Sequence, residues 1–354
     1  MSLNFALMGC GRIARKHAEI LGGHFVKNAN LTAVCDCDRD RAMAFGEKYK
    51  IPAYFSLEDM VKAHPEIDVV NILTPSGLHA EHAIRAANLG KHVVVEKPMA
   101  LRLADADDMI RVCDRMGVRL FVVKQNRFNR AVLRLHEALT AGRFGKIVCG
   151  TVRVRWSRTQ EYYDHDAWRG TWAYDGGVFS NQASHHIDLL EWMLGTPVSV
   201  YATTRTALVH IETEDTGFAL IRFAGGAIGS VEATTATRPK DLEGSISILG
   251  EKGSVVIGGF AVNRIETWDF VEKLPSDDTV FQDTLQTPPN VYGFGHIPYM
   301  ENVVDCILNK KHALVDGIEG RHSLELISAM YESAETGREV RMKYFPEKCK
   351  LGIR

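Results

Sequence analysis

Short apolar runs alternate with helical patterns through the first third of the chain, and this alternation limits the possible folds more than any other feature. The predicted strands are Phe5–Met8, Leu31–Cys35, Val69–Leu73, His92–Val95 and Leu120–Val123. The predicted helices are Ile13–Leu21, Arg39–Lys48, Leu57–Ala63, His79–Leu89 and Ala104–Met116. Strands and helices that alternate at this spacing indicate a doubly wound parallel sheet with crossover helices, which is an α/β domain.

The pattern changes near Lys124, where a second domain is predicted to begin. Most later apolar segments alternate as antiparallel strands do: 146–158, 198–208, 216–223, 227–234, 244–249 and 254–257. Gly225-Gly226 is typical of a tight turn between two of them. Helices are predicted at 130–141, 181–194, 299–308 and 320–337. We therefore expect a dinucleotide-binding domain at 1–123 and an α+β domain with a largely antiparallel, open sheet at 124–354.

Composition excludes several classes of protein. The 354 residues carry 42 Lys and Arg against 44 Asp and Glu, so a net charge of −2 gives no electrostatic case for nucleic acid. No apolar run approaches the roughly 20 residues that span a bilayer, and the first residues lack the basic segment of a signal peptide. The seven cysteines are scattered without a CxxC pair. These features predict a cytoplasmic protein with reduced thiols and neither a membrane partner nor a zinc site.

Residues 9–14, with the sequence GCGRIA, fit the G-x-G-x-x-A pattern between the first strand and the first helix. The first glycine permits a tight turn, the second lets a pyrophosphate approach the backbone, and the alanine lets helix and strand pack closely. The start of the helix supplies free N–H groups for the phosphates. The cofactor-binding residues predicted here are Gly9, Gly11, Arg12 and Ile13.

Asp36 ends the next strand, where a carboxylate would bind both ribose hydroxyls and repel a 2′-phosphate. Arg39 could bind such a phosphate, but the negative charge of Asp38, which lies between Asp36 and Arg39 in the sequence, would repel it. Asp36 therefore predicts NAD rather than NADP as the cofactor.

The tripeptide Glu96-Lys97-Pro98 follows an apolar strand at the edge where ligands bind in such sheets. Lys97 is thus a candidate proton-transfer group beside the cofactor, and the position points to an enzyme. The turn with Thr74, Pro75 and His79 follows another strand and is predicted to lie near the nicotinamide half of the cofactor. A plain turn with a helix-opening histidine is the alternative for that segment.

The stretch 176–190 places two glycines before a predicted helix. Asn181, His185 and Asp188 would share one helical face, since they are four and three residues apart. His185 and His186 are adjacent, so they would project about 100° apart and could not easily bind one metal ion. We therefore predict no metal here.

Together, Gly9–Ala14, the Thr74-Pro75…His79 turn, Glu96-Lys97-Pro98 and Gly176–Leu190 resemble the Gfo/Idh/MocA family of NAD(P)-dependent sugar oxidoreductases. The resemblance covers nearly the whole chain. It implies a Rossmann domain joined to an α/β domain whose open sheet often mediates oligomerisation, here expected as a homotetramer. Lys97 takes the place of the family's catalytic lysine and His185 that of its histidine. Asn181 replaces the aspartate of the family's Asp-x-x-x-His motif, and an amide cannot relay a proton, so Asn181 should orient substrate by hydrogen bonds.

Within the family, 124–129 (KQNRFN) and 181–185 (NQASH) most resemble enzymes that oxidise C3 of UDP-N-acetyl-glucosaminuronic acid for bacterial surface polysaccharide. That substrate carries a carboxylate and a diphosphate, which arginine binds through paired N–H groups. The residues expected at the substrate are Lys97, Asn126, Arg127, Arg155, Asn181 and His185. In related enzymes a Trp-Arg pair lies against the cofactor, so the resemblance implies that Trp168 and Arg169 contact the cofactor here. The alternative is that Trp168 only anchors a loop by its burial. The resemblance also places Glu96 and Lys97 beside the cofactor.

The resemblance implies hydride transfer from a sugar carbon to NAD while Lys97 takes the hydroxyl proton. Lysine has an ordinary pKa of about 10.4, so the pKa must fall for this role; His185 is the second candidate. Three alternatives remain: a dehydrogenase of inositol or a free sugar, a non-catalytic NAD-binding regulator and a DNA-binding protein. Lys97 and His185 argue against the second, and the charge against the third. Whether NADH is released or reoxidised in place by 2-oxoglutarate is left open.

Overall fold

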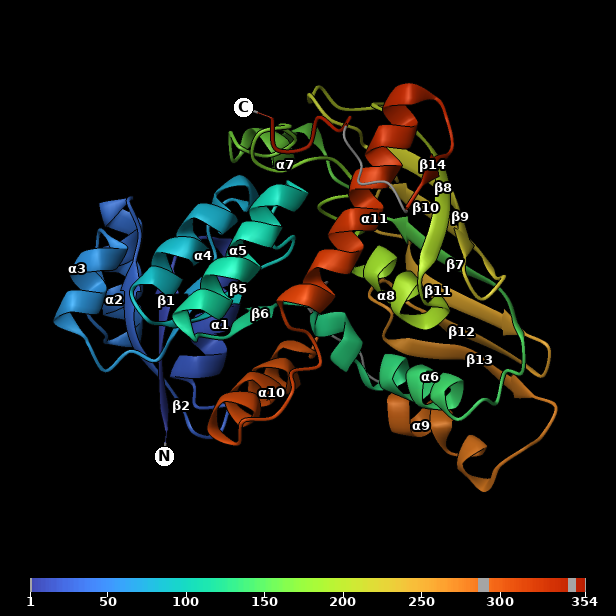
Figure 1. Cartoon of the computed structure of the whole chain (residues 1–354), viewed down its shortest axis with the longest axis horizontal. Coiled ribbons are helices and arrows are strands. Elements are labelled where there is room, and N and C mark those ends of the chain that lie inside the picture. Colours follow the sequence, from blue (N-terminus) through green and yellow to red (C-terminus); the bar gives the residue numbers. More distant parts are fainter. Residues whose placement is uncertain (1, 286–292, 343–347, 354) are drawn as a thin grey trace. The chain divides into compact units, whose positions relative to one another are not determined.

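The structure is a computed structural model that describes residues 2–285, 293–342 and 348–353 (Figure 1). The chain divides into two compact units. Unit 1 comprises Met1–Lys124 and His296–Arg321, and unit 2 comprises Gln125–Gly295 and His322–Arg354.

Unit 1 is built on a six-stranded parallel sheet in the order β3-β2-β1-β4-β5-β6. Its strands are β1 (Leu3–Met8), β2 (Ala29–Cys35), β3 (Ala53–Tyr54), β4 (Val69–Ile72), β5 (His92–Val95) and β6 (Leu120–Val122). The central strand β4 is buried along its whole length, as expected when helices cover both faces of a parallel sheet. The predicted doubly wound α/β domain is confirmed. The edge strand β3 was missed because two half-buried residues are too short to show a periodicity.

One helix of unit 1 comes from the C-terminal third of the chain, which returns to this unit. They are α1 (Arg12–Gly22), α2 (Arg39–Tyr49), α3 (Leu57–Ala63), η1 (Ser76–Leu78), α4 (His79–Asn88), α5 (Leu103–Met116) and α10 (His296–Leu308). Helix α4 packs beside α5, and α10 packs against α1. The guanidinium of Arg119 donates to the Cys306 carbonyl oxygen at 3.1 Å, and Phe121 forms a β-bridge with Asp316. Residues 296–321 therefore pack with unit 1, which differs from the simple division at residue 124 that the sequence suggests.

Unit 2 holds an eight-stranded sheet in the order β13-β12-β11-β7-β10-β9-β8-β14. The strands are β7 (Ile147–Arg155), β8 (Pro197–Arg205), β9 (Thr216–Phe223), β10 (Ile228–Thr234), β11 (Glu243–Gly250), β12 (Gly253–Gly258), β13 (Arg264–Phe270) and β14 (Val340–Arg341). Strands β7 and β10 are parallel, whereas the other neighbours are antiparallel. The largely antiparallel sheet is confirmed, including the turn at Gly225-Gly226 between β9 and β10. Strand β13 was missed, since a register shift opposite Ile257 breaks its alternation.

One face of this sheet is covered and the other is exposed. The helices of unit 2 are α6 (Arg130–Thr140), α7 (Gln160–Asp164), α8 (Ser184–Leu194), α9 (Val280–Thr284) and most of α11 (Gly317–Thr336), with short turns η2 (Gln125–Phe128) and η3 (Pro275–Asp277). Helix α8 packs on β7, β10 and β11 (Figure 1). The opposite face presents exposed apolar side chains, namely Tyr201, Phe218, Leu220, Ile228 and Leu249. We call these five residues the open apolar face.

Two further findings bear on the class of protein. None of the helices in the described parts of the chain has the length and apolar character needed to cross a membrane. All seven cysteines are free thiols.

Candidate active site

The turn between β1 and α1 has the geometry that the glycine motif requires. Gly9 adopts a φ of +100°, and a Cβ there would lie 2.8 Å from the Leu73 carbonyl oxygen, so a side chain is excluded. A Cβ on Gly11 would meet nothing within 4 Å, and α1 begins without a side-chain cap. Arg12 and Ile13 form the first turn of α1. Open space in front of uncapped N–H groups fits a pyrophosphate.

Asp36 lies immediately after β2 and is bonded to the same turn. One carboxylate oxygen accepts a hydrogen bond from the Cys10 N–H at 2.7 Å, and the other accepts one from the Asp38 N–H at 2.9 Å. The carboxylate thus joins the glycine turn to the start of α2. This contact fixes the position of Asp36, while its predicted bond to a ribose stays a prediction.

Lys97 is half-buried directly after β5, within a turn that neighbouring side chains brace. The ring of His79 lies between two carbonyl oxygens, with Nδ1 2.7 Å from that of Pro98 and Nε2 2.8 Å from that of Thr74. Burial lowers the pKa of His79, although these two carbonyls and Glu96 act in the opposite direction. His79 therefore joins the Thr74-Pro75 turn to the lysine turn, so these predicted residues do lie together.

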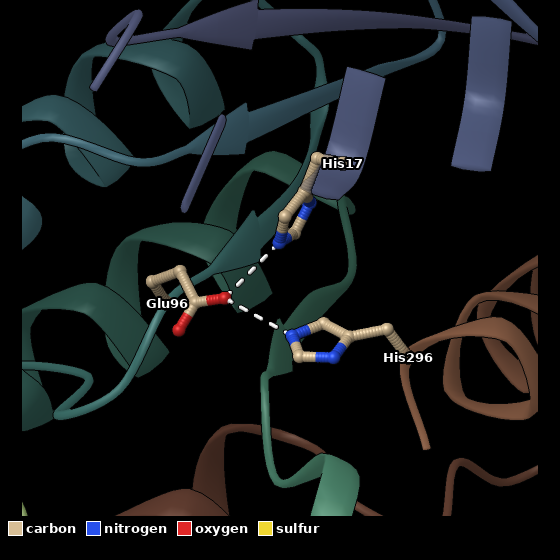
Figure 2. A group of neighbouring side chains, drawn as sticks. All are labelled: His17, Glu96 and His296. Atoms are coloured by element: carbon tan, nitrogen blue, oxygen red, sulfur yellow. Dashed lines mark hydrogen bonds and ion pairs between the residues drawn. The ribbon is translucent and has the colours of Figure 1, made fainter. Parts of the chain in front are cut away.

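Glu96 points into unit 1 rather than toward solvent (Figure 2). Its Oε1 lies 3.0 Å from His17 Nε2 and 3.8 Å from His296 Nε2. Its Oε2 accepts a hydrogen bond from the Lys97 N–H at 3.1 Å. The two histidines were missed by the sequence analysis, because they come from α1 and α10 and carry no motif.

Asn181 lies before helix α8 and not within it, which corrects the predicted helix start and the predicted helical face. The backbone around it is bound by side chains instead: the Phe179 N–H donates to Glu214 at 3.0 Å and the Ser180 N–H to Tyr331 at 3.3 Å. The Asn181 amide nitrogen donates to the carboxylate of Asp175. Tertiary contacts therefore replace the first helical turn and fix the orientation of Asn181.

Glu214, Tyr331 and Asp175 support this loop and were not predicted. The Glu214 carboxylate lies against Gly177, where a Cβ would come 2.0 Å from its oxygen. Burial raises the pKa of Glu214 to about 7, and hydrogen bonds from Phe179 and Tyr331 act against that rise. The paired glycines before the helix could have indicated a close contact here, since Gly177 leaves room for the buried carboxyl group of Glu214.

His185 lies in the first turn of α8 and is buried. The Gln125 side-chain nitrogen lies 3.0 Å from His185 Nε2 and donates to it, which leaves the proton of a neutral imidazole on Nδ1. His186 packs edge-on against Trp156, and burial lowers its pKa to about 4. The two adjacent histidines therefore have different neighbours, Gln125 for His185 and Trp156 for His186.

Arg127 and Asn126 are buried on η2. The guanidinium of Arg127 donates to both carboxylate oxygens of Asp188 on α8, each at 2.9 Å, and both side chains are at most 3% exposed. This pair ties η2 to α8 and so ties Gln125 to His185. The role of Arg127 and Asn126 at a substrate stays a prediction, and the observed role of Arg127 is an internal ion pair.

Arg155 and the helix that carries His185 lie on opposite faces of the eight-stranded sheet, so the two residues do not share a site within one chain. It pairs with Glu232 at 2.6 Å and Glu243 at 3.1 Å, on the face that also carries Arg153. The other face of β7 meets Leu190 of α8, as the contact at Gly150 shows. Because successive strand residues alternate between faces, the structure argues against Arg155 as a substrate ligand beside His185.

Trp168 and Arg169 lie in a loop that is held by stacked cations and rings. Arg169 lies 4.5 Å from the ring centre of Trp168 and 4.6 Å from that of Tyr162, and it pairs with Asp166 at 2.9 Å. These contacts order the loop, while its contact with the cofactor stays a prediction.

Comparison with known proteins identifies the two parts of the chain. Residues 3–124 match the model described as "Oxidoreductase family, NAD-binding Rossmann fold", and residues 136–342 match "Oxidoreductase family, C-terminal alpha/beta domain", the GFO_IDH_MocA pair.

Two solved structures are similar over nearly the whole chain. The WlbA dehydrogenase from Bordetella pertussis, in complex with NADH and UDP-GlcNAcA, is 46% identical, with a TM-score of 0.91 over 96% of this chain and 97% of that one. The WlbA enzyme from Chromobacterium violaceum, with the same ligands, is 46% identical, with a TM-score of 0.89 over 96% of both chains. A curated relative, myo-inositol 2-dehydrogenase from Thermotoga maritima, is 28% identical over 96% of this chain and 99% of its own length.

Proposed function

Because the chain belongs to the Gfo/Idh/MocA family of NAD-dependent oxidoreductases acting on CH–OH groups, we propose that it oxidises the C3 hydroxyl of UDP-N-acetyl-glucosaminuronic acid to a 3-keto sugar. The observation that carries the proposal is the 46% identity, over 96% of this chain, to WlbA structures that contain NADH and this nucleotide sugar. The proposed role is in the supply of sugars for bacterial surface polysaccharide, and the free thiols favour the cytoplasm.

In the proposed site, the glycine turn and Asp36 hold the cofactor. When bound, NAD⁺ supplies the hydride acceptor. Lys97 takes the proton of the C3 hydroxyl, and His185, which Gln125 holds as a neutral ring, hydrogen-bonds the same substrate. Asn181 orients a ring substituent, since its amide is fixed by Asp175. The arrangement needs no proton relay through residue 181.

A second candidate is a dehydrogenase of a neutral polyol, which the full-length match to a myo-inositol 2-dehydrogenase favours. A polyol carries no carboxylate or diphosphate, so it needs none of the charged ligands that the uronate requires. A non-catalytic regulator is disfavoured by the presence of both Lys97 and His185.

The deciding experiment measures NADH absorbance after purified protein is mixed with NAD⁺ and UDP-N-acetyl-glucosaminuronic acid, with and without 2-oxoglutarate. UDP-N-acetyl-glucosamine, which lacks the carboxylate, and myo-inositol serve as matched controls. We expect a 3-keto product from the uronate and none from either control compound. If the product forms only when 2-oxoglutarate is present, NADH is reoxidised in place. Turnover of myo-inositol without turnover of the uronate would reject the proposed substrate.

We also propose that the open apolar face joins copies of this chain into a homotetramer. Leu220 is 59% exposed on β9, between Tyr201 on β8 and Ser230 on β10. A contiguous exposed apolar surface of this kind is typical of an interface. Leu220→Asp should lower the molar mass measured by light scattering, because a buried unpaired charge is costly. Phe25→Asp, in unit 1 and 57% exposed, is the matched control that should leave the mass unchanged. An unchanged mass for Leu220→Asp would exclude this face.

A further inference from the structure

The diphosphate of a nucleotide sugar needs cations, and the two arginines expected at the substrate have other partners. Arg127 is paired with Asp188 inside unit 2, and Arg155 is paired with Glu232 on the face of the sheet opposite α8. Cations elsewhere in unit 2 are therefore better candidates for the charged end of such a substrate.

Two segments of unit 2 leave its sheet side by side. Strands β7 and β10 are parallel and are paired up to their last residues. Beyond these ends the Arg158 N–H donates to the Thr235 carbonyl oxygen at 2.9 Å, and the Thr237 N–H donates to the Trp156 carbonyl oxygen at 3.1 Å. Residues that follow the two strands are thus brought together at one edge of the sheet.

Rings and guanidinium groups alternate in a stack that holds the first of these segments. Its five members, in order, are Trp156, Arg158, Tyr162, Arg169 and Trp168, and we call them the cation–ring stack. Arg158 lies 5.4 Å from the ring centres of both Trp156 and Tyr162. Arg169 lies 4.6 Å from the ring centre of Tyr162 and 4.5 Å from that of Trp168. All four distances are within the roughly 6 Å over which a cation attracts an aromatic face, so the stack holds both guanidinium groups in place.

Both ends of the cation–ring stack adjoin residues proposed to hold the sugar. At one end Trp156 packs edge-on against the residue that follows His185 on α8, with ring centres 5.7 Å apart. At the other end the residue after Arg169 donates its backbone N–H to the Asp175 carboxylate at 2.8 Å. The same carboxylate accepts the amide of Asn181. The stack therefore lies next to the proposed sugar ligands of unit 2.

The guanidinium of Arg158 has donors that the protein does not use. Its Nη1 donates to the Ser157 carbonyl oxygen at 2.7 Å and to Asp241 at 3.0 Å. Among the residues that the structure describes, none accepts a hydrogen bond from Nε or Nη2 of Arg158. The side chain is only 15% exposed. A partly buried guanidinium with five N–H groups and one engaged nitrogen leaves room for paired bonds to an anion.

Arg238 lies beside Arg158 and adds a second positive charge. Its guanidinium donates to three backbone carbonyl oxygens, those of Arg158 and Thr235 at 3.0 Å and that of Thr237 at 2.8 Å. These acceptors are neutral, and no ion pair within the described ranges of the chain includes Arg238. Asp241 pairs with Arg158 alone. Two cations beside one carboxylate leave an excess of positive charge at fixed positions.

We propose that Arg158 and Arg238 bind the diphosphate of the nucleotide sugar. A guanidinium pairs its N–H groups with two phosphate oxygens, and two such groups on adjoining segments match two linked phosphates. The carboxylate of the uronate is a single charge that would need only one of them. The inference rests on the proposed function, and it names ligands for the charged end of a substrate whose sugar end is assigned above.

The rival interpretation is that Arg158 only holds its loop through the bond to Asp241. Substitutions on both sides of that pair separate the two roles. Arg158→Met removes the cation, whereas Asp241→Asn removes the opposing charge and keeps an oxygen that can accept the Ser157 N–H. If Arg158 binds an anion, Arg158→Met should weaken binding and Asp241→Asn should not. If the pair is only structural, both should weaken binding alike, and that outcome would overturn the proposal.

The first measurement is a calorimetric titration with UDP, with the protein saturated with NADH so that UDP does not enter the dinucleotide site. We expect Arg158→Met and Arg238→Met each to raise the Kd of UDP by about 10- to 100-fold, the loss typical of hydrogen bonds to charged groups. Asp241→Asn should keep or lower the Kd. Arg222→Met is the matched control, since Arg222 is an exposed cation of β9 that pairs with Glu339 at 3.6 Å, and its Kd should equal that of the wild type. The same Kd in the wild type and both arginine variants would overturn the proposal.

Two further ligands identify which anion the pair binds. Uridine carries no phosphate, and free glucuronate carries a carboxylate without phosphate. We expect neither ligand to distinguish the arginine variants from the wild type. A loss of glucuronate binding in these variants, with UDP binding unchanged, would overturn the proposal and assign the pair to the carboxylate. If Arg158→Met does not fold, Arg158→Lys replaces it; lysine keeps the charge without the paired N–H groups, so a smaller rise in Kd is expected.

The second measurement is the steady-state kinetics of UDP-N-acetyl-glucosaminuronic acid oxidation. The diphosphate is remote from C3, so we expect KM to rise with the Kd of UDP in Arg158→Met while kcat stays near the wild-type value. If the wild type binds UDP through Arg158 but does not oxidise the uronate, the proposed reaction fails and the diphosphate site stands. If the wild type oxidises the uronate and all variants bind UDP equally, the site fails and the reaction stands. A wild type that does not bind UDP would overturn the site as well.

Discussion

Lys97→Met should lower kcat by about 10²- to 10⁴-fold, the range that general base catalysis contributes. Methionine is unbranched and nearly as long as lysine but can neither accept a proton nor carry charge. The glycine turn and Asp36, which are predicted to hold the cofactor, follow other strands, β1 and β2. Stopped-flow detection of NADH formation would measure the loss, and calorimetric titration with NAD⁺ should give a Kd near that of the wild type.

The control for this variant is Lys91→Met. Lys91 is a half-buried lysine whose amine donates to the Pro65 carbonyl oxygen at 2.9 Å, and its loss should leave kcat unchanged. Near-normal turnover by Lys97→Met would remove Lys97 from the role of base and transfer attention to His185. A loss of NAD⁺ binding in Lys97→Met would instead show that the lysine holds the cofactor.

Arg127→Met should lower the free energy of unfolding by about 3–5 kcal/mol, since it leaves the Asp188 carboxylate buried without its cation. Asp188 is 2% exposed and receives two hydrogen bonds from this guanidinium. Arg127 also lies 4.9 Å from the ring centre of Trp192, so packing is lost with the charge. Urea unfolding followed by circular dichroism would measure the change.

A double variant tests the cause. Arg127→Met with Asp188→Leu replaces both partners by apolar groups and should regain most of the stability, because no unpaired charge remains. Arg134→Met breaks an exposed pair with Glu137 and should change stability by no more than about 1 kcal/mol. If Arg127→Met also lowered the free energy of unfolding by no more than about 1 kcal/mol, the cost assigned to an unpaired buried Asp188 would be wrong.

The double variant also tests the predicted contact of Arg127 with substrate. If the protein is folded and its KM for the uronate is unchanged, the ion pair is the whole role of Arg127. A large rise in KM at wild-type stability would show that the guanidinium binds the uronate as well.

The elements that the sequence predicted well are those with a strong local signal. The strands and helices of unit 1 follow from their periodicity, and the glycine turn follows from residues that only such a turn requires, as the φ of Gly9 shows. The start of α8 was misplaced because the loop before it is held by Glu214 and Tyr331, which are distant in the sequence. The short edge strands and β13 were missed for lack of an uninterrupted alternation.

The candidate site divides in the same way. By itself the sequence determined the fold of each domain, the glycine turn between the first strand and the first helix, and the position of Lys97 at a strand end, because each depends on neighbouring residues and on one pattern of burial. Only the tertiary structure decided what the charged groups do. Arg127 became an internal partner of Asp188, Arg155 a member of an ion-pair network on the far face of the sheet, and Glu96 the centre of a buried cluster. Those outcomes depend on which side chains meet across 61 or more residues of sequence, and the cost of burying a charge depends on the partner that lies beside it.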